Sequence, residues 1–245
     1  MERLEAELDR ARTVSVSRLA DAIEAIGFEC TRCGACCTAE EPSKPTETET
    51  DPEPHTATIF PAEIRRLQEA TNAHEQYYDW RDIARPMPYG LDDENSEQGE
   101  TFEWAIQTDD CGDCTFYTES ADGTGACTVH EDRPLICRTY PFSIGSLSAD
   151  TAGGLGTTEP MGGVVEQQDI VRAHECEGLG RDIARSDAEE LARALKERAI
   201  RELEEAIGVR DNYHSTGEDG IVVHDSEGQK RPDGTPIESA REHNR

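Results

Sequence analysis

The sequence predicts an α+β domain that is small, rich in helices and loops, and contains a short β-hairpin. Apolar residues recur at helical spacing in several segments, and an Asp-Gly pair separates two short segments of strand-like composition. Hydrophobic residues make up only 35% of the 245 residues, so the apolar core should be lean. A lean core makes additional cross-links, either disulfides or bound metal ions, more important to the fold.

In the first half of the chain, the pattern of apolar residues predicts mainly helices. Leu19, Ile23 and Ile26 recur at helical spacing, and Gly27 follows them as a stop signal. Pro61 suits the first turn of a helix, where its missing N–H has no partner to lose. The predicted elements are helices over 2–12, 15–27, 61–70 and 74–85, solvated loops over 39–54 and 90–100, and a strand over 101–107.

The second half combines a hairpin with further helices. The pair Asp122-Gly123 favours a hairpin turn between two strand-like segments that each begin with a cysteine. Asp132 is predicted to cap a short helix that carries Cys137. The predicted elements are strands over 114–119 and 127–131, a glycine-rich loop over 151–163 and a helix over 187–208.

These elements define the expected domain organisation. The loop over 151–163 lacks the Gly-Lys-Ser/Thr ending of a phosphate-binding loop. Residues 187–208 carry one apolar stripe, which is most simply a core contact. Apolar residues are sparse over 211–245, which predicts a disordered tail. We therefore expect one domain over 1–210, with a motif core over 28–180, followed by that tail.

The composition also indicates the setting of the protein. The formal net charge is −29, from 53 acidic and 24 basic residues, and the acidic residues are spread along the whole chain. Such a surface is typical of adaptation to high salt, and we expect a halophilic, haloarchaeal source. The same negative field repels phosphate, which argues against nucleic acid as a partner. The charged N-terminus and the lack of a long apolar run predict a cytoplasmic protein without membrane contact, whose thiols stay reduced.

The stretch "FECTRCGACC", residues 28–37, concentrates four cysteines. The chain has nine of them: Cys30, Cys33, Cys36, Cys37, Cys111, Cys114, Cys127, Cys137 and Cys176. An odd number without an export signal argues against a disulfide framework. Two cysteines separated by two residues are the recurring half-site of zinc and iron–sulfur ligation. Gly34 supplies the free backbone that a turn around a metal needs. The cysteines therefore predict a metal centre around which the domain is organised.

The first cysteine group does not complete a site by itself. Its spacing matches the opening of bacterial ferredoxin clusters, but Glu40 stands where the fourth cysteine is expected. The remaining ligands are expected from Cys114, Cys127, Cys137 and Cys176. Adjacent Cys36 and Cys37 point in different directions, so one of them could serve a second centre. Eight thiolates could fill two four-sulfur sites, or one cluster and a mononuclear site, and the sequence does not divide them.

Other side chains near the cysteines in the sequence have candidate roles. Arg32, Arg133 and Arg138 could donate hydrogen bonds that offset thiolate charge, although arginine is also the ordinary cation of this chain. His130 and His174 could complete a mixed site, but solvated or hydrogen-bonding histidines are the simpler interpretation. No cysteine is accompanied by the base and orienting group of a nucleophilic site.

Four segments together resemble a known family. They are "FECTRCGACC" at 28–37, "CTFY" at 114–117, "CTVHEDRPLICRTYPF" at 127–142 and "HECEGLG" at 174–180. The chain resembles the CxxCxxCC cysteine-cluster family of zinc- or iron-chelating proteins, the YkgJ-like group. The resemblance implies eight metal ligands, which are Cys30, Cys33, Cys36, Cys37, Cys114, Cys127, Cys137 and Cys176. Cys111 is additional to that pattern and is a candidate extra ligand, a spare thiol or a redox partner for Cys114.

Three functional hypotheses follow. The first is a metal-binding protein, structural or electron-transferring, with an unknown protein partner; zinc and an iron–sulfur cluster both fit, and the ferredoxin-like opening slightly favours iron–sulfur. The second is an enzyme, either a redox catalyst or a protein-lysine methylase, because the cysteine cluster is similar to that of flagellin lysine N-methylases. The third is a thiol–disulfide protein that uses Cys111 and Cys114, which requires an exposed thiol of low pKa.

Overall fold

The structure is a computed structural model that describes residues 2–40, 52–73, 77–92, 95–145, 162–216 and 219–237. The chain divides into two compact units. Unit 1 comprises Met1–Ala57 and Thr108–Leu203, and unit 2 comprises Thr58–Gln107 and Glu204–Arg245. Helices and several small sheets occur together, so the predicted α+β class is confirmed. We expected one domain over 1–210, whereas residues 58–107 cluster with the C-terminal segment instead.

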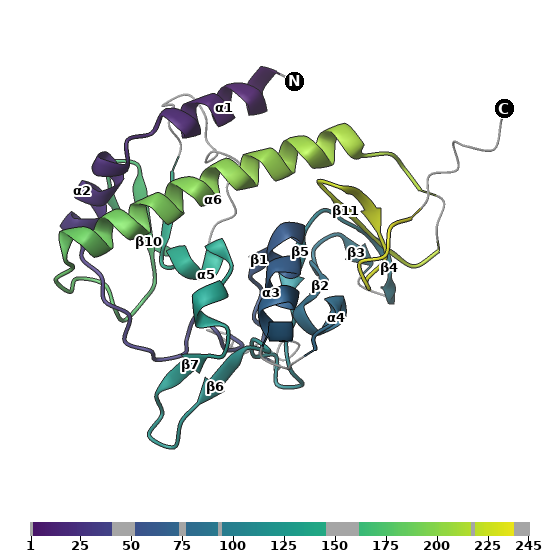
Figure 1. The fold of residues 1–245 in the computed structure, drawn as a ribbon, viewed down its shortest axis with the longest axis horizontal. Coiled ribbons are helices and arrows are strands. Elements are labelled where there is room, and N and C mark those ends of the chain that lie inside the picture. Colours follow the sequence, from purple (N-terminus) through teal and green to yellow (C-terminus); the bar gives the residue numbers. More distant parts are fainter. Residues whose placement is uncertain are drawn as a thin grey trace, which may run out of the picture. The chain divides into compact units, whose positions relative to one another are not determined.

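The described residues of unit 1 form three helices, a 3-10 turn, two small sheets and the first part of the long helix α6. Figure 1 shows these elements. Its elements are α1 (Glu2–Thr13), α2 (Val16–Ile26), β6 (Tyr117–Glu119), β7 (Gly125–Cys127), η1 (His130–Asp132), α5 (Leu135–Thr139), β8 (Phe142–Ile144), β9 (Val164–Gln168), β10 (Val171–His174) and α6 (Arg185–Asn212). The sheet order is β8–β10–β9, all antiparallel, and β6 pairs with β7. The two N-terminal helices, the hairpin and the long helix are therefore confirmed.

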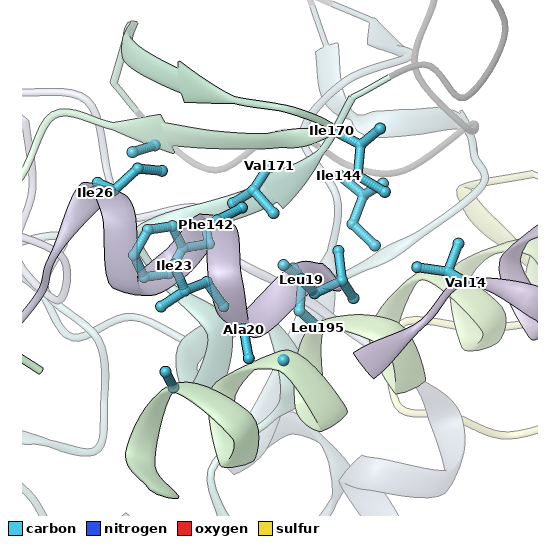
Figure 2. Packing of buried hydrophobic residues seen from close by; sticks show 14 of the residues in the cluster. Val14, Leu19, Ala20, Ile23, Ile26, Phe142, Ile144, Ile170, Val171 and Leu195 are labelled. Atoms are coloured by element: carbon cyan, nitrogen blue, oxygen red, sulfur yellow. The ribbon is translucent and has the colours of Figure 1, made fainter. Parts of the chain in front are cut away.

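The apolar core of unit 1 lies between α2, α6 and the strands β8 and β10 (Figure 2). Leu19 and Ile23 of α2 and Val171 of β10 are fully buried, and Leu195 of α6 is almost so. These residues belong to the apolar stripes that define the two helices, so each helix buries the face that its sequence pattern predicts. This core fixes the end of α2, where the first cysteine group begins.

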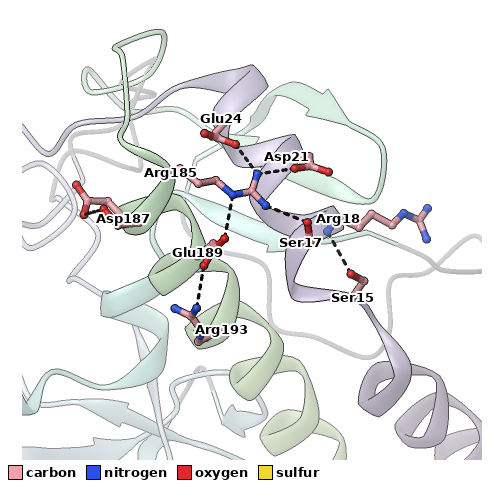
Figure 3. A network of polar contacts seen from close by, with 10 residues as sticks. Ser15, Ser17, Arg18, Asp21, Glu24, Arg185, Asp187, Glu189 and Arg193 are labelled. Atoms are coloured by element: carbon pink, nitrogen blue, oxygen red, sulfur yellow. Dashed lines mark hydrogen bonds and ion pairs between the residues drawn. The ribbon is translucent and has the colours of Figure 1, made fainter.

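A polar network on the surface of unit 1 joins α2 to α6 (Figure 3). The Arg185 guanidinium contacts Asp21 and Glu24 of α2, and it donates to Ser17 Oγ at 2.9 Å and to Glu189 Oε1 at 3.0 Å. These groups are largely solvated, so the network should orient the helices more than it stabilises them.

A buried ion pair on α6 is hydrogen-bonded to the last residue of α5. The side chains of Arg198 and Glu202 on α6 are only 2% and 4% exposed, and Arg198 Nε donates to Glu202 Oε1 at 2.8 Å. Arg198 Nη1 also donates to Thr139 Oγ1 at 3.1 Å and to the Phe142 carbonyl at 3.2 Å. The pair therefore ties α6 to the end of the short helix that carries Cys137.

The part of unit 2 that the structure describes contains two helices of its own, the last part of α6 and two sheets. Its elements are β1 (Thr58–Ile59), α3 (Pro61–Ala73), α4 (Trp80–Ile83), β2 (Ala84–Pro86), β3 (Leu91–Asp92), β4 (Asn95–Thr101), β5 (Trp104–Ile106), β11 (Ile221–Asp225) and β12 (Gly228–Lys230). One sheet has the order β1–β5–β2 and the other β12–β11–β4–β3, in which β11 and β4 are parallel. The helix predicted to begin at Pro61 is confirmed, and it extends three residues beyond the expected end.

Charged groups line the interior of unit 2. Asp225 accepts from Trp104 Nε1 at 2.9 Å and from Lys230 Nζ at 2.7 Å, and both charged side chains are buried. Lys230 also donates to Glu227 at 2.7 Å, and Arg65 pairs with the same carboxylate. The Arg65 hydrogen bond is the largest cause that lowers the pKa of Glu227, to about 2.

Several sequence expectations need correction. The tail over 211–245 was expected to be disordered, but β11 and β12 lie within it, because β11 gains backbone hydrogen bonds from β4 on one side and β12 on the other. The loop expected over 90–100 contains β3 and most of β4 for the same reason. Within 74–85, only α4 is helical among the described residues. Most of the glycine-rich loop over 151–163 lies outside the described residues.

Candidate metal centre

The first cysteine group forms a tight turn directly after α2. Cys37 N donates to the Gly34 carbonyl at 2.7 Å, and Gly34 adopts a positive φ of 82°. A Cβ at Gly34 would overlap the hydroxyl end of the Tyr117 ring. Glycine therefore serves this turn in two ways, because it accepts the left-handed backbone and leaves room for the tyrosine. We call Phe28–Cys33 the first limb of the turn and Gly34–Cys37 the second limb.

The first limb is hydrogen-bonded to the loop that carries Cys176. Glu29 N donates to the Gly178 carbonyl at 3.0 Å, and Gly180 N donates to the Gly27 carbonyl at 3.1 Å. A Cβ at Gly178 would overlap the Glu29 carbonyl, so the two backbones approach as closely as glycine permits. Residues separated by about 150 positions in the chain thus lie side by side.

The second limb is hydrogen-bonded to the segment that carries Cys114. Cys114 N donates to the Cys37 carbonyl at 2.8 Å. The β6–β7 hairpin follows directly, and its register places Tyr117 opposite Cys127. The hairpin is also bonded to the first limb, because Gly125 N donates to the Arg32 carbonyl at 2.8 Å.

Backbone N–H groups point at three of these sulfurs. Gly178 N donates to Cys176 Sγ at 3.4 Å. Tyr117 N donates to the Cys114 carbonyl at 2.8 Å. The N–H groups of Phe116 and Tyr117 lower the pKa of the Cys114 thiol, and that of Val129 lowers the pKa of the Cys127 thiol. Burial acts in the opposite direction, most strongly at Cys114, whose pKa it raises to about 11. The sulfurs are therefore partly desolvated and supplied with donors that favour the thiolate.

Cys36 lies at the centre of the group. Its sulfur is 3.8 Å from that of Cys37. The hydrogen bond to Cys37 is the largest cause that raises the pKa of Cys36, followed by burial. Burial is the largest cause that raises the pKa values of Cys114, Cys127 and Cys176, and the charge of Cys36 adds to it, at Cys114 after the charge of Cys127. These sulfurs are close enough to repel one another when ionised, which a bound cation would relieve.

The three arginines expected beside the sulfurs differ in placement. Arg133 lowers the pKa values of both Cys36 and Cys127, so its positive charge lies near these two sulfurs. Arg32 is exposed and has a positive φ of 58°, and its backbone carbonyl accepts from Gly125 N. Arg138 is half-buried on α5, and its N–H donates to the Pro134 carbonyl. Arg133 Nε donates to the His130 carbonyl at 3.0 Å. The predicted roles of all three arginines as donors to the sulfurs stay predictions.

The two remaining cysteines, Cys137 and Cys111, differ in exposure. Cys137 is half-buried in α5, as expected, although the expected Asp132 cap is wrong, because Asp132 ends η1 and Pro134 precedes the helix. Cys111 is exposed, and its N–H donates to Asp109 Oδ1 at 2.9 Å. All nine cysteines are free thiols. The raised pKa of Cys114 argues against its use as an attacking thiol beside Cys111.

The two histidines near cysteines have other environments. His174 is buried, with Nε2 2.9 Å from Ser143 Oγ and Nδ1 3.1 Å from the Gly162 carbonyl. A carbonyl only accepts, so Nδ1 carries the proton and Nε2 accepts from the serine. Both nitrogens are used, which confirms the hydrogen-bonding interpretation. His130 is exposed, with Nδ1 3.3 Å from Glu131 Oε1.

Tyr140 is a site residue whose place the sequence did not reveal. Its hydroxyl donates to the Glu175 carbonyl, one residue before Cys176. Burial raises its pKa, and the charges of Cys176 and Cys36 add to that effect. The Tyr-Pro pair that follows Cys137 and Arg138 was a visible signal, but its position beside Cys176 depends on a contact across 35 residues.

The residue types in this region suit a thiolate-bound metal, but their side chains do not converge on a single ion position in this structure. Among the residues that the structure describes, no three Cys, His, Asp or Glu side chains are placed to hold one ion. The cysteine-bearing segments are joined by hydrogen bonds between backbone groups. These bonds fix the positions of the backbones but do not set the directions of the cysteine side chains. The donor set favours zinc or iron, because thiolates with N–H donors and a nearby guanidinium suit both.

Comparisons with known proteins support the same chemistry. A family model named CxxCxxCC, described as "Putative zinc- or iron-chelating domain", matches residues 29–177, which is more than half of the chain. No curated protein and no solved structure shows a significant match. Within the described ranges, no helix has the length and apolar character to cross a membrane.

Proposed function

The chain belongs to the CxxCxxCC family, and from this premise we propose that its cysteines hold zinc or an iron–sulfur cluster. The eight ligands are Cys30, Cys33, Cys36, Cys37, Cys114, Cys127, Cys137 and Cys176. One observation carries the proposal: thiols from three separate loops receive backbone N–H bonds while partly withdrawn from water. The N–H bonds favour ionised sulfur, whereas burial raises the pKa of each thiol, so a bound cation would supply the charge that holds these sulfurs in the metal-binding thiolate form.

The residues of unit 1 have distinct parts in this proposal. A bound metal would supply positive charge that offsets repulsion among the thiolates. The tight turn presents four sulfurs from one short segment, and the hydrogen-bonded loops bring the others toward it. Arg133 adds positive charge near Cys36 and Cys127. The ferredoxin-like spacing of the turn slightly favours iron–sulfur over zinc.

Metal quantification on full-length protein purified without oxygen tests the proposal. Tightly bound zinc in a colourless protein, or iron with inorganic sulfide and a visible absorption band, would support it and identify the metal. Protein that retains neither metal, and does not take up either after reconstitution, would contradict it. Cys111→Ser serves as the matched control, because this exposed thiol lies outside the family pattern and should leave the metal content unchanged.

The exposure of the first limb favours a role beyond structural support. Cys30 and Cys33 are both exposed, so a redox partner or substrate could approach these sulfurs. Our first candidate is a structural or electron-transfer centre in a cytoplasmic protein. Its partner would be another, unidentified protein, and neither nucleic acid nor a membrane. Reversible reduction of the loaded protein in a potentiometric titration would support electron transfer, and a redox-silent zinc centre would support a structural role.

An enzyme that uses the centre is the second candidate, because the same exposure admits a substrate. Its two forms are a redox catalyst and a protein-lysine methylase. The methylase form predicts methyl groups on lysine side chains after incubation of loaded protein, methyl donor and lysine-rich peptide, detected by mass spectrometry. Peptides without added methyl groups would contradict that form.

A further inference from the structure

The β11–β12 hairpin of unit 2 packs against the end of α6. Ser226 and Glu227 form the turn between the two strands. A Cβ at Gly208 of α6 would lie 2.6 Å from Ser226 Cβ, so the helix and the turn are in close contact. Asn212, the last residue of α6, donates from Nδ2 to the Ser226 carbonyl at 2.7 Å. The last turns of α6 therefore hold this hairpin.

The hairpin contains a buried histidine. His224 of β11 is 1% exposed, and it lies opposite Gln229 of β12. The imidazole stacks on the Phe102 ring, with centroids 5.3 Å apart, and its centroid lies 4.9 Å from that of the Tyr213 ring. These aromatic contacts withdraw the imidazole from water, where its charged form is most stable.

The hydrogen bonds of Gln229 determine which imidazole nitrogen carries the proton. Gln229 Nε2 donates to the Asn212 carbonyl at 3.0 Å, which orients the side-chain amide. The same amide nitrogen lies 3.2 Å from His224 Nδ1. An amide nitrogen only donates, so Nδ1 accepts and the proton of the neutral ring is on Nε2. That proton faces Glu100, whose Oε2 lies 3.5 Å from Nε2.

A second proton on the imidazole does not fit this arrangement. It would bind at Nδ1 and face an N–H of Gln229, and two donors cannot bond each other. Rotation of the amide would offer its oxygen to Nδ1, but it would break the bond to Asn212 and set two acceptors against each other. Either way, protonation of His224 removes a side-chain contact between the hairpin and the end of α6.

The charged groups around His224 act in both directions. Burial is the largest influence, and it lowers the pKa of His224 below the ordinary value of 6.5. The charge of Glu100 on β4 opposes this effect, as does that of Asp225 on β11, which is itself paired with Lys230. The charge of His214, which follows α6, lowers the pKa further. The folded unit therefore favours the neutral imidazole.

We propose that His224 is a proton-operated latch in unit 2: the neutral ring holds the β11–β12 hairpin on the end of α6, and uptake of a proton from solvent releases it. A histidine whose pKa is lowered by folding contributes stability above its unfolded value, and this stability is lost as the pH falls below that value. At pH 5.5, an exposed histidine is about 90% protonated, so opening of the hairpin should become up to about tenfold easier than at pH 7.5.

Hydrogen–deuterium exchange of the full-length chain at pH 7.5 and 5.5 tests the latch. Ionic strength is held constant, and the rates are corrected for the intrinsic effect of pH. In wild type, peptides covering 221–230 should lose between about threefold and tenfold of their protection at pH 5.5, and peptides from α2 should not change. Unchanged protection over 221–230, or an equal loss in α2, would overturn the proposal.

Two variants assign the response to one histidine. His224→Phe keeps an aromatic ring but cannot take up a proton, so its protection over 221–230 should be equal at the two pH values. His214→Gln is the matched control, because it removes a neighbouring histidine and should preserve the loss seen in wild type. A loss in His224→Phe as large as in wild type, or none in His214→Gln, would overturn the assignment to His224.

An NMR titration of wild-type protein avoids variants that fail to fold. The His224 ring is identified by its proximity to the Phe102 and Tyr213 rings. It should titrate below pH 6.5, with the proton of the neutral form on Nε2. Titration at or above pH 6.5, or a neutral form protonated on Nδ1, would overturn the latch. None of these measurements involves the cysteines, so their outcome is independent of the proposed metal binding.

Discussion

The turn that carries the first four cysteines depends on Gly34, so Gly34→Ala should damage the metal-loaded protein in two ways. The φ of 82° at this position is unfavourable for any side chain, which costs about 1–2 kcal/mol. The new methyl group also meets the Tyr117 ring, whose Cζ lies 2.7 Å from the expected Cβ position. Relieving such a contact typically costs about 1–3 kcal/mol. The expected total is therefore about 2–5 kcal/mol.

Gly123 provides a matched control for the backbone contribution. It has the same φ of 82°, but a Cβ there meets no atom within 4 Å. Gly123→Ala should therefore cost only about 1–2 kcal/mol. Urea unfolding of the two loaded variants measures both losses, because metal binding and folding share one free energy.

The difference between the two glycine variants isolates the contact with Tyr117. Gly34→Ala should cost about 1–3 kcal/mol more than Gly123→Ala. In a Tyr117→Ala background this excess should disappear, since the atom that the methyl group meets is gone. Equal losses for Gly34→Ala and Gly123→Ala would refute the reasoning that the tyrosine packs against the cysteine turn.

Three further outcomes are expected from other parts of the molecule. Arg198→Met breaks a buried ion pair and should lower the free energy of unfolding in urea by about 3–5 kcal/mol, whereas Arg193→Met, at an exposed position of the same helix, should cost far less; similar losses would contradict the burial argument. The pKa of Glu227 is lowered from 4.5 to about 2, so its contribution is complete above pH 4.5 and is lost as pH falls toward 2. The thermal unfolding midpoint should therefore fall more steeply with decreasing pH for wild type than for Glu227→Gln. The difference should be small, because the Glu227 side chain is 39% exposed. Identical pH profiles would contradict a stabilising role of the Glu227 carboxylate. Chelation of the metal should loosen residues 28–180 and leave 187–208 partly helical by circular dichroism; an unchanged thermal transition would contradict this.

Strong local periodicity explains which elements could be predicted from the sequence. α2 and α6 carry continuous apolar stripes, and the structure buries Leu19, Ile23 and Leu195 on those faces. The Asp122-Gly123 pair specified the hairpin turn in the same local way, and the described strands align on either side of it. Such signals depend only on neighbouring residues, so they can be recognised without knowledge of the rest of the fold.

The parallel strands of unit 2 could not be predicted by the same means. β4 is polar and acidic, and its pairing with β11 joins residues about 120 positions apart, such as Gly99 and Ile221. Interior charges such as Asp225 and Lys230 also look like surface residues in the sequence. Their burial depends on partners that only the assembled unit provides, so composition alone indicated a disordered tail.

The candidate site was predictable in composition but not in arrangement. Cysteine spacing and the family resemblance predicted a set of ligands, and the structure brings segments with Cys114, Cys127 and Cys176 to the turn. The close approaches at Gly34 and Gly178 involve Tyr117 and Glu29, which lie far from them along the chain. The charge of Arg133 likewise lowers the pKa values of two cysteines from distant segments. A linear pattern cannot show such contacts, because it gives spacing along the chain and no direction in space.

X-ray absorption at the edge of the bound metal tests the central claim most directly. The claim is that sulfurs from distant segments share metal ions in the native protein. Full-length chain prepared without oxygen should show a first shell of about four sulfur atoms, at about 2.3 Å if the metal is zinc. A first shell dominated by nitrogen and oxygen, in protein whose cysteines all remain open to alkylation, would contradict the account.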